Sequence, residues 1–437
     1  MKKGFKKFLM VVAVLFAMIP CVFAFSGCSF SVAEQFADEM GYESVEELMD
    51  ALKGKDGKDG KDGEDGKDAT GLDPWDMYVA AIDNDEFEGT YIEFCKQFVN
   101  TEVDSSMAIA NECLLSVVKV HPYMSKNGLT GQLTDFAGSV GSGVFVSVDG
   151  NGSAYVLTNY HVAFNSNRCA PYYELYMYQD NDPIIAEFVG GAATYDLALL
   201  KVTNSDILKD SNAKAVKFST GDVRVGTGTI AIGNTEGEGI AVTNGTVSVD
   251  SENIELDVKG AHTYRVMRHE TFISHGNSGG ALFNLNGELI GITNAGDDTF
   301  EHWNYAIPST LAYRVYQNIL ANNGDVKVFA LGISTQSIDT LVKYNTSTGM
   351  VDIVDTLRVA NVQAGGSVAN VGGLYQGSIL KSIEINGVEH VLTRNFHPSE
   401  LMLDIRVGDE IVLHATYGGT PLEISLTATA NYFSVKA

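Results

Sequence analysis

Three polar residues, far apart along the chain, have the side chains that covalent acyl transfer requires. His161 stands in the segment LTNYHV, Asp196 in YDLALL and Ser278 in the glycine-rich segment GNSGGA. Acyl transfer at neutral pH needs an activated nucleophile, a base with a pKa of about 6.5, and a carboxylate that fixes the tautomer of the imidazole. Because all three residue types are present, the sequence favours this chemistry.

The glycines on either side of Ser278 serve a second requirement of the reaction. Negative charge develops on the carbonyl oxygen of the substrate, and backbone N–H groups aimed at that oxygen stabilise it. Glycine permits the dihedral angles that turn consecutive N–H groups to one side. A serine among glycines is by itself most often part of a turn, so the prediction depends on its conjunction with His161 and Asp196.

Short strands must position these residues. From about Ser116 the chain consists of apolar, β-branched runs separated by Gly, Asn and Asp, for example residues 116–120, 143–146 and 154–157. Strands at this spacing, without long helices between them, predict an all-β sandwich or a pair of barrels. In this pattern His161 lies at the end of a strand and Asp196 at the start of one.

The motifs resemble those of the HtrA (DegP/DegS-like) branch of the trypsin-like serine proteases. The resemblance covers residues 105–322, in the family's order of His, Asp and Ser, and implies a mainly β, chymotrypsin-like double β-barrel. The matching segments are GSGV at 141–144, TNYHV at 158–162, YDLA at 195–198, IGN at 232–234, VTNGTVS at 242–248, GNSGGALFNLNGELIG at 276–291 and YAIP at 305–308.

The resemblance implies a role for each residue of the site. Ser278 Oγ would attack the scissile carbonyl, His161 would carry the proton to the leaving amine, and Asp196 would orient His161. The backbone amides of Gly276 and Ser278 would form the oxyanion hole.

The resemblance also locates the primary specificity pocket. Ile273 and Gly296 lie where the family lines this pocket. Small or medium apolar substrate residues are therefore expected at P1, the position before the scissile bond. The family often has an apolar side chain where this chain has Gly296, so the sequence does not predict the size of the pocket.

Two other motifs near Ser278 would predict different chemistry, but the first lacks the structural context it needs and the second has the wrong spacing. Gly276-x-Ser278-x-Gly280 fits the nucleophile elbow of α/β-hydrolases, but that elbow needs a helix after the serine, whereas residues 284–287 read as a turn and 289–292 as a strand. His269 and His275 are six residues apart, not the four that a zinc-protease helix needs. No metal site is expected.

The amino terminus carries the features of an export signal. Four lysines precede an apolar run at residues 8–25, and SGC follows at 26–28. The segment FSGC resembles a bacterial lipobox, which implies removal of residues 1–27 and lipidation of Cys28. Plain secretion is the alternative. The other mature cysteines, Cys95, Cys113 and Cys169, predict neither a disulfide framework nor a zinc site.

The segments after Cys28 read as a stalk. A short helical segment is expected at 28–53, a spacer at 54–71 and a small helical module at 72–100. The spacer contains five Gly-X-Asp triplets, a collagen-like period without proline. Charged, glycine-rich tracts are usually extended and solvated, and local trimerisation is the alternative.

Residues 329–437 carry a fresh set of predicted strands and resemble a PDZ domain of the HtrA type. Such a domain binds a peptide as an added strand and captures its carboxylate on loop amides. The resemblance assigns that loop to Leu331, Gly332 and Ile333. A structural β-domain without a ligand is the alternative.

Composition excludes one class of partner. The chain has 29 Lys and Arg against 55 Asp and Glu, a net charge of −26, whereas nucleic-acid binding relies on clustered cations.

We expect a membrane-anchored, extracytoplasmic serine endopeptidase acting on unfolded or damaged exported proteins. The resemblance implies a homotrimer without a metal or organic cofactor. The alternative is a non-catalytic lipoprotein that binds polypeptides on a protease-like scaffold.

Overall fold

The computed structural model describes residues 109–165, 167–257, 259–296, 303–346 and 349–436. The chain divides into two units, Met1–Asn111 and Glu112–Ala437, and nearly all of the described residues belong to the second. The predicted signal peptide, the stalk segments and Cys28 lie outside the described residues. Among the helices that are described, none combines the length and the apolar character that a membrane span requires.

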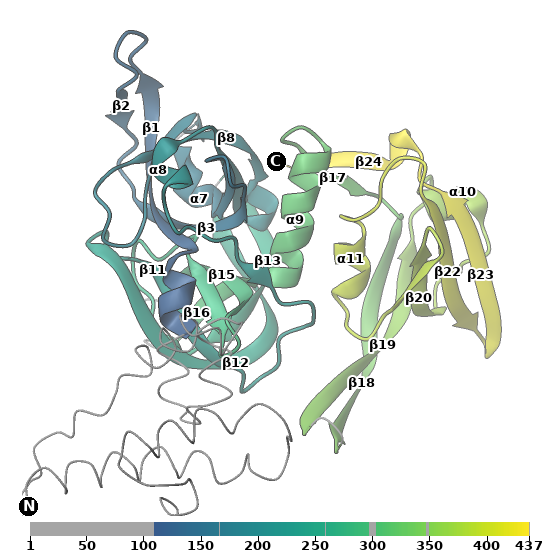
Figure 1. The fold of residues 1–437 in the computed structure, drawn as a ribbon. Helices are drawn as coiled ribbons and strands as arrows, with labels where there is room; N and C mark the ends of the chain where they lie inside the picture. Colours follow the sequence, from purple (N-terminus) through teal and green to yellow (C-terminus); the bar gives the residue numbers. More distant parts are fainter. Residues whose placement is uncertain (1–108, 166, 258, 297–302, 347–348, 437) are drawn as a thin grey trace, which may run out of the picture. The chain divides into compact units, whose positions relative to one another are not determined.

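The first domain of this unit begins with a barrel of seven antiparallel strands (Figure 1). Its strand order is β2-β1-β3-β4-β9-β8-β7, and a pairing between β1 and β7 closes the sheet. The strands are β1 (Val117–Lys126), β2 (Leu133–Phe136), β3 (Gly141–Val148), β4 (Ala154–Thr158), β7 (Tyr172–Tyr176), β8 (Ile184–Ala192) and β9 (Leu197–Val202). Alternate residues of these strands, such as Val118, Val120 and Leu175, fill the interior, as the period of two in a strand requires.

A second barrel follows the same plan. Its order is β10-β15-β14-β11-β12-β13-β16, closed by a pairing of β15 with β16. The strands are β10 (Lys217–Phe218), β11 (Gly228–Thr235), β12 (Gly239–Asp257), β13 (Ala261–His269), β14 (Ala281–Asn284), β15 (Glu288–Gly296) and β16 (Asn304–Pro308). The predicted double β-barrel is confirmed.

Short elements connect the strands. They are α7 (Tyr160–Ala163), β5 (Phe164–Asn165), β6 (Arg168–Cys169), η3 (Ala193–Tyr195) and α8 (Asp206–Lys209). The helix α9 (Ser309–Ala321) follows the second barrel and buries Leu311, Val315 and Ile319, which recur at the spacing of one helical face.

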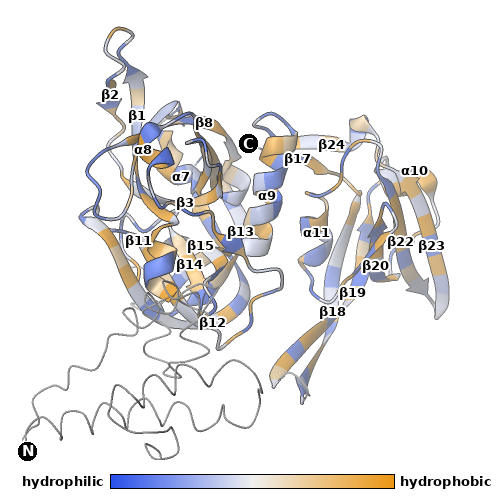
Figure 2. Cartoon of the chain, viewed as in Figure 1, coloured by the Kyte–Doolittle hydropathy of each residue, from blue (hydrophilic) through white to orange (hydrophobic). Residues whose placement is uncertain are grey.

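The C-terminal domain has its own sheet and its own core. Strands β18 to β23 form the sheet, and β17 pairs with β24 beside it. The elements are β17 (Val326–Phe329), β18 (Ile333–Asn345), β19 (Met350–Val362), α10 (Ser367–Val371), β20 (Ile379–Ile385), β21 (Val388–Val391), α11 (His397–Leu401), β22 (Glu410–Tyr417), β23 (Thr420–Thr427), η4 (Ala430–Tyr432) and β24 (Phe433–Lys436). Figure 2 shows apolar residues along β18 and β19, and Leu341, Val342 and Tyr344 are exposed there.

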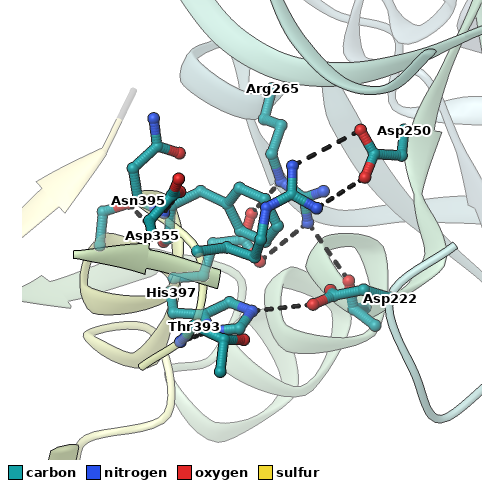
Figure 3. Close-up of polar contacts among 12 residues, drawn as sticks. Asp222, Asp250, Arg265, Asp355, Thr393, Asn395 and His397 are labelled. Carbon is teal, nitrogen blue, oxygen red and sulfur yellow. Dashed lines mark hydrogen bonds and ion pairs between the residues drawn. The ribbon is translucent and has the colours of Figure 1, made fainter. Parts of the chain in front are cut away.

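Ion pairs connect α11 and the residues before it to the second barrel. Glu400 binds the guanidinium of Arg265 through two hydrogen bonds, of 2.5 Å and 3.0 Å, and both side chains are buried. The Arg265 guanidinium also lies 3.8 Å from the centre of the Phe396 ring. Two further pairs, drawn in Figure 3, join Arg394 to Asp250 at 2.6 Å and His397 to Asp222 at 2.8 Å.

Candidate active site

The pairing of β4 with β9 brings His161 and Asp196 together. Thr158, the last residue of β4, faces Ala198 near the start of β9, so the residues just beyond each strand lie side by side. His161 lies in the short helix α7, where a strand end was expected. Asp196 follows η3 with a positive φ of 49°.

His161 and Asp196 form a tight pair. Nδ1 of His161 lies 2.7 Å from Oδ2 of Asp196, and the backbone N–H of His161 donates to Oδ1 at 2.9 Å. A carboxylate only accepts, so Nδ1 carries the proton and Nε2 is left as the basic nitrogen. Burial alone would lower the pKa of His161, but the charge of Asp196 and the hydrogen bond to it outweigh burial and raise this pKa above 6.5.

Ser278 lies in the loop between β13 and β14. Its hydroxyl donates to the backbone carbonyl of Asn294 at 2.8 Å, and within the described residues it makes no hydrogen bond to His161. The side chain of the same Asn294 donates to Asp196 Oδ2 at 2.6 Å. Asn294 therefore contacts both the nucleophile and the carboxylate. Nothing in the sequence distinguished it from other strand residues.

The loop before Ser278 contains two backbone amides that make no hydrogen bond within the described residues. Gly276 has a φ of +86°, and a Cβ there would lie 2.1 Å from the carbonyl oxygen of Asn234, so only glycine fits. The carbonyl of His275 accepts from the N–H of Glu236 at 2.6 Å. Since C=O and N–H point in opposite directions across a trans peptide, the Gly276 N–H points away from Glu236. Neither this amide nor that of Ser278 has an acceptor among the described residues.

The predicted specificity pocket has a polar neighbour. Ile273 is buried. Gly296 pairs with Asn304 across β15 and β16, and a Cβ at Gly296 would lie 3.1 Å from Asn304 Oδ1. No motif pointed to this amide, and the apolar preference at P1 stays a prediction.

The loop of Leu331, Gly332 and Ile333 lies between β17 and β18. The carbonyls of Leu331 and Gly332 accept hydrogen bonds from Ser367 Oγ at 2.9 Å and from the N–H of Gln363 at 2.8 Å. A cavity of about 230 Å³ adjoins the loop and is lined by Gly332, Gln363 and Tyr432 among others. Capture of a peptide carboxylate here stays a prediction.

The described residues contain no group of three His, Cys, Asp or Glu side chains able to hold a metal ion. Cys113 and Cys169 are free thiols. His269, one of the histidines weighed as a metal ligand, is fully buried on β13, and burial lowers its pKa to about 4.

The chain is similar to known trypsin-like serine proteases. The family model of the trypsin-like peptidase domain matches residues 141–292. A probable periplasmic serine protease do/HhoA-like from Haemophilus influenzae is 36% identical over 201 residues, which cover 44% of this chain and 39% of that protein. The chain thus spans less than half of that relative's length.

A second relative is covered more fully. The serine protease Do-like HtrA of Lactococcus lactis subsp. cremoris is 30% identical over 312 residues, covering 65% of this chain and 73% of that protein. The solved structure of the HtrA-type protease AlgW with a tripeptide is 25% identical, with a TM-score of 0.51 over 76% of this chain and 98% of that chain. The chain belongs to the Do-like HtrA family of serine proteases.

Proposed function

We propose that this protein is an extracytoplasmic serine endopeptidase that cleaves unfolded or damaged exported polypeptides. The observation that carries the proposal is the 2.7 Å contact between His161 and Asp196, together with the hydrogen bonds that join both Ser278 and Asp196 to Asn294. The family supplies the reaction class, and the name of the Haemophilus influenzae relative, a periplasmic protease, supports the location.

The reaction begins with attack of Ser278 Oγ on the scissile carbonyl carbon. Rotation of the serine side chain takes Oγ from the Asn294 carbonyl toward His161, whose Nε2 accepts the hydroxyl proton. The carbonyl oxygen becomes an oxyanion and accepts hydrogen bonds from the amides of Gly276 and Ser278. A single donor of this kind stabilises the transition state of a serine protease by about 3 kcal/mol.

Collapse of this intermediate breaks the C–N bond, and His161 donates its proton to the leaving amine. A water molecule then attacks the ester carbon, His161 accepts a proton from that water, and the C–Oγ bond breaks as Ser278 regains a proton. Asp196 stabilises the imidazolium at both stages through its hydrogen bond to Nδ1.

The C-terminal domain would bind polypeptide C-termini at the loop of Leu331, Gly332 and Ile333. Two observations support this proposal: Gly332 has a positive φ of +78°, and the carbonyls of Leu331 and Gly332 accept hydrogen bonds from Ser367 and Gln363. The N–H across each of these trans peptides points away from those donors. Lipidation of Cys28 would anchor the protein to the membrane, and family resemblance supports a homotrimer.

The second candidate is a non-catalytic polypeptide binder. The observation that favours it is the hydrogen bond of the Ser278 hydroxyl to Asn294 and not to His161. Casein cleavage by the wild type and by Ser278→Ala, each with and without C-terminal peptides, separates the two. Endopeptidase function predicts cleavage by the wild type alone. Retention of peptide binding without any cleavage would favour the binder, and cleavage by Ser278→Ala would mean that the nucleophile is another residue.

A further inference from the structure

Asn294 occupies a position that no motif predicted, and its backbone and side chain act on different parts of the site. It lies on β15 and is 1% exposed. Its carbonyl accepts from Ser278 Oγ at 2.8 Å, and its side-chain Nδ2 donates to Asp196 Oδ2 at 2.6 Å. A displacement of this one residue would therefore alter the nucleophile and the carboxylate together.

The carboxylate of Asp196 depends on its donors, because its side chain is fully buried. Oδ1 accepts from the backbone N–H of His161 at 2.9 Å, whereas Oδ2 is shared between His161 Nδ1 at 2.7 Å and Asn294 Nδ2 at 2.6 Å. Charge-assisted hydrogen bonds of this length are the strong ones. Asn294 is thus the only side chain besides His161 that donates to this carboxylate among the described residues.

Tyr264 fixes which way the Asn294 amide faces. Its hydroxyl, on β13, lies 2.9 Å from Asn294 Oδ1. The Asp196 carboxylate can only accept, so Nδ2 must face it, and Oδ1 must accept from the tyrosine hydroxyl. Burial, together with the negative charge of Asp196, raises the pKa of Tyr264 far above 10, so the hydroxyl keeps its proton throughout the working pH range.

We propose that Asn294 is a positioning residue that couples Ser278 to the His161–Asp196 pair, and that Tyr264 acts only through Asn294. The inference rests on the proposed function.

Asn294 shares Oδ2 with His161, so loss of the Asn294 amide leaves the whole charge of that oxygen to the imidazolium. The pKa of His161 then rises and less of the neutral base is present at a given pH. The other ionisable side chains that adjoin the pair in the described part of the chain include Tyr264, Tyr160 and Tyr195, and burial raises the pKa of each, so they stay neutral.

The test compares Asn294→Ala, Tyr264→Phe and the double variant of the full chain. Each is assayed from pH 5 to 9 for kcat/KM on casein-derived peptides and for the rate of fluorophosphonate labelling at Ser278. Because Asn294→Ala loses a hydrogen bond to a charged group, we expect its kcat/KM and labelling rate to fall by about 10- to 100-fold. The acid limb of its pH profile should move to higher pH. Tyr264→Phe should show a smaller change in the same direction.

The double variant tests the coupling between the two residues. If Tyr264 acts through Asn294, adding Tyr264→Phe to the Asn294→Ala variant should lower kcat/KM by less than about a further twofold. Tyr173→Phe is the matched control, because it removes another buried tyrosine hydroxyl bond, to the Ala170 carbonyl at 2.6 Å in the first barrel. This control should leave the pH profile in place even if it lowers the melting temperature.

An unchanged acid limb in Asn294→Ala would overturn the inference, and so would full additivity of the two substitutions. If Asn294→Ala does not fold, a shifted profile in Tyr264→Phe still supports the inference and an unshifted one overturns it. A wild type that neither labels nor cleaves would contradict the proposed function itself, which distinguishes that failure from the failure of this inference.

Discussion

The backbone N–H of Ser142 donates to the carbonyl of Ser278 at 2.8 Å. Strand β3 of the first barrel thereby holds the nucleophile loop of the second. The Ser142 hydroxyl adds to this contact, because it donates to the Gly276 carbonyl and accepts from the N–H of Asn234, both at 2.7 Å. Through these two hydrogen bonds, the Ser142 hydroxyl of β3 contacts both the turn at Gly276 and Asn234 of β11.

Ser142→Ala removes this side-chain contact. The buried N–H of Asn234 and the partly buried carbonyl of Gly276 each lose a partner. We therefore expect destabilisation of ~1–3 kcal/mol and at least ~10-fold slower fluorophosphonate labelling of Ser278. The control is Ser147→Ala on the same strand, since that hydroxyl makes no hydrogen bond within the described residues. Equal labelling rates for the two variants would argue against a role of Ser142 in the loop.

The raised pKa of His161 predicts the direction of the pH dependence. The reaction needs neutral His161, so kcat/KM should rise with pH and reach half its plateau above pH 6.5. The same shift stabilises the folded protein below pH 6.5, and this contribution is lost as pH rises through the folded pKa. A labelling-rate profile with its midpoint below 6.5 would contradict the dominance of Asp196 over burial.

Much of this organisation was predictable. The double β-barrel and the serine-protease family followed from short β-branched runs and from contiguous motifs such as residues 276–291. The contacts that Ser142 and Asn294 make in the site were not, because they arise where strands distant in sequence meet. His161 was expected at a strand end, yet it lies in the helical turn α7. The alternation of apolar residues could not reveal this, because the turn is accompanied by a long-range hydrogen bond from the Asn159 side chain to the Asp196 carbonyl at 2.9 Å.

His269 should make the protein less stable in acid. Burial lowers its pKa to about 4, so the unfolded chain binds a proton between pH 6.5 and 4 that the folded chain does not. Stability from this group therefore falls by about 3 kcal/mol over that interval. Urea unfolding at pH 7 and pH 4.5 should show a smaller acid loss in His269→Leu than in the wild type. An identical loss would place the acid sensitivity elsewhere.

The buried ion pair of Arg265 and Glu400 should affect the free energy of unfolding more than exposed ion pairs do when one partner is removed. Glu400→Ala leaves the guanidinium buried without its carboxylate, and breaking such a pair costs about 3–5 kcal/mol. Lys217 and Glu288 provide the comparison, because Lys217 is 77% exposed and its removal should cost less than ~1 kcal/mol. Thermal unfolding of Glu400→Ala and Lys217→Ala tests the difference, and equal shifts would contradict it.

The most direct test of the account is mass-spectrometric mapping of fluorophosphonate modification on the peptide-stimulated protein. The account predicts a single modified residue, Ser278, in the wild type, with modification abolished in Ser278→Ala and reduced by at least ~100-fold in His161→Ala. A folded wild type that remains unmodified, or that is modified at another serine, would contradict it.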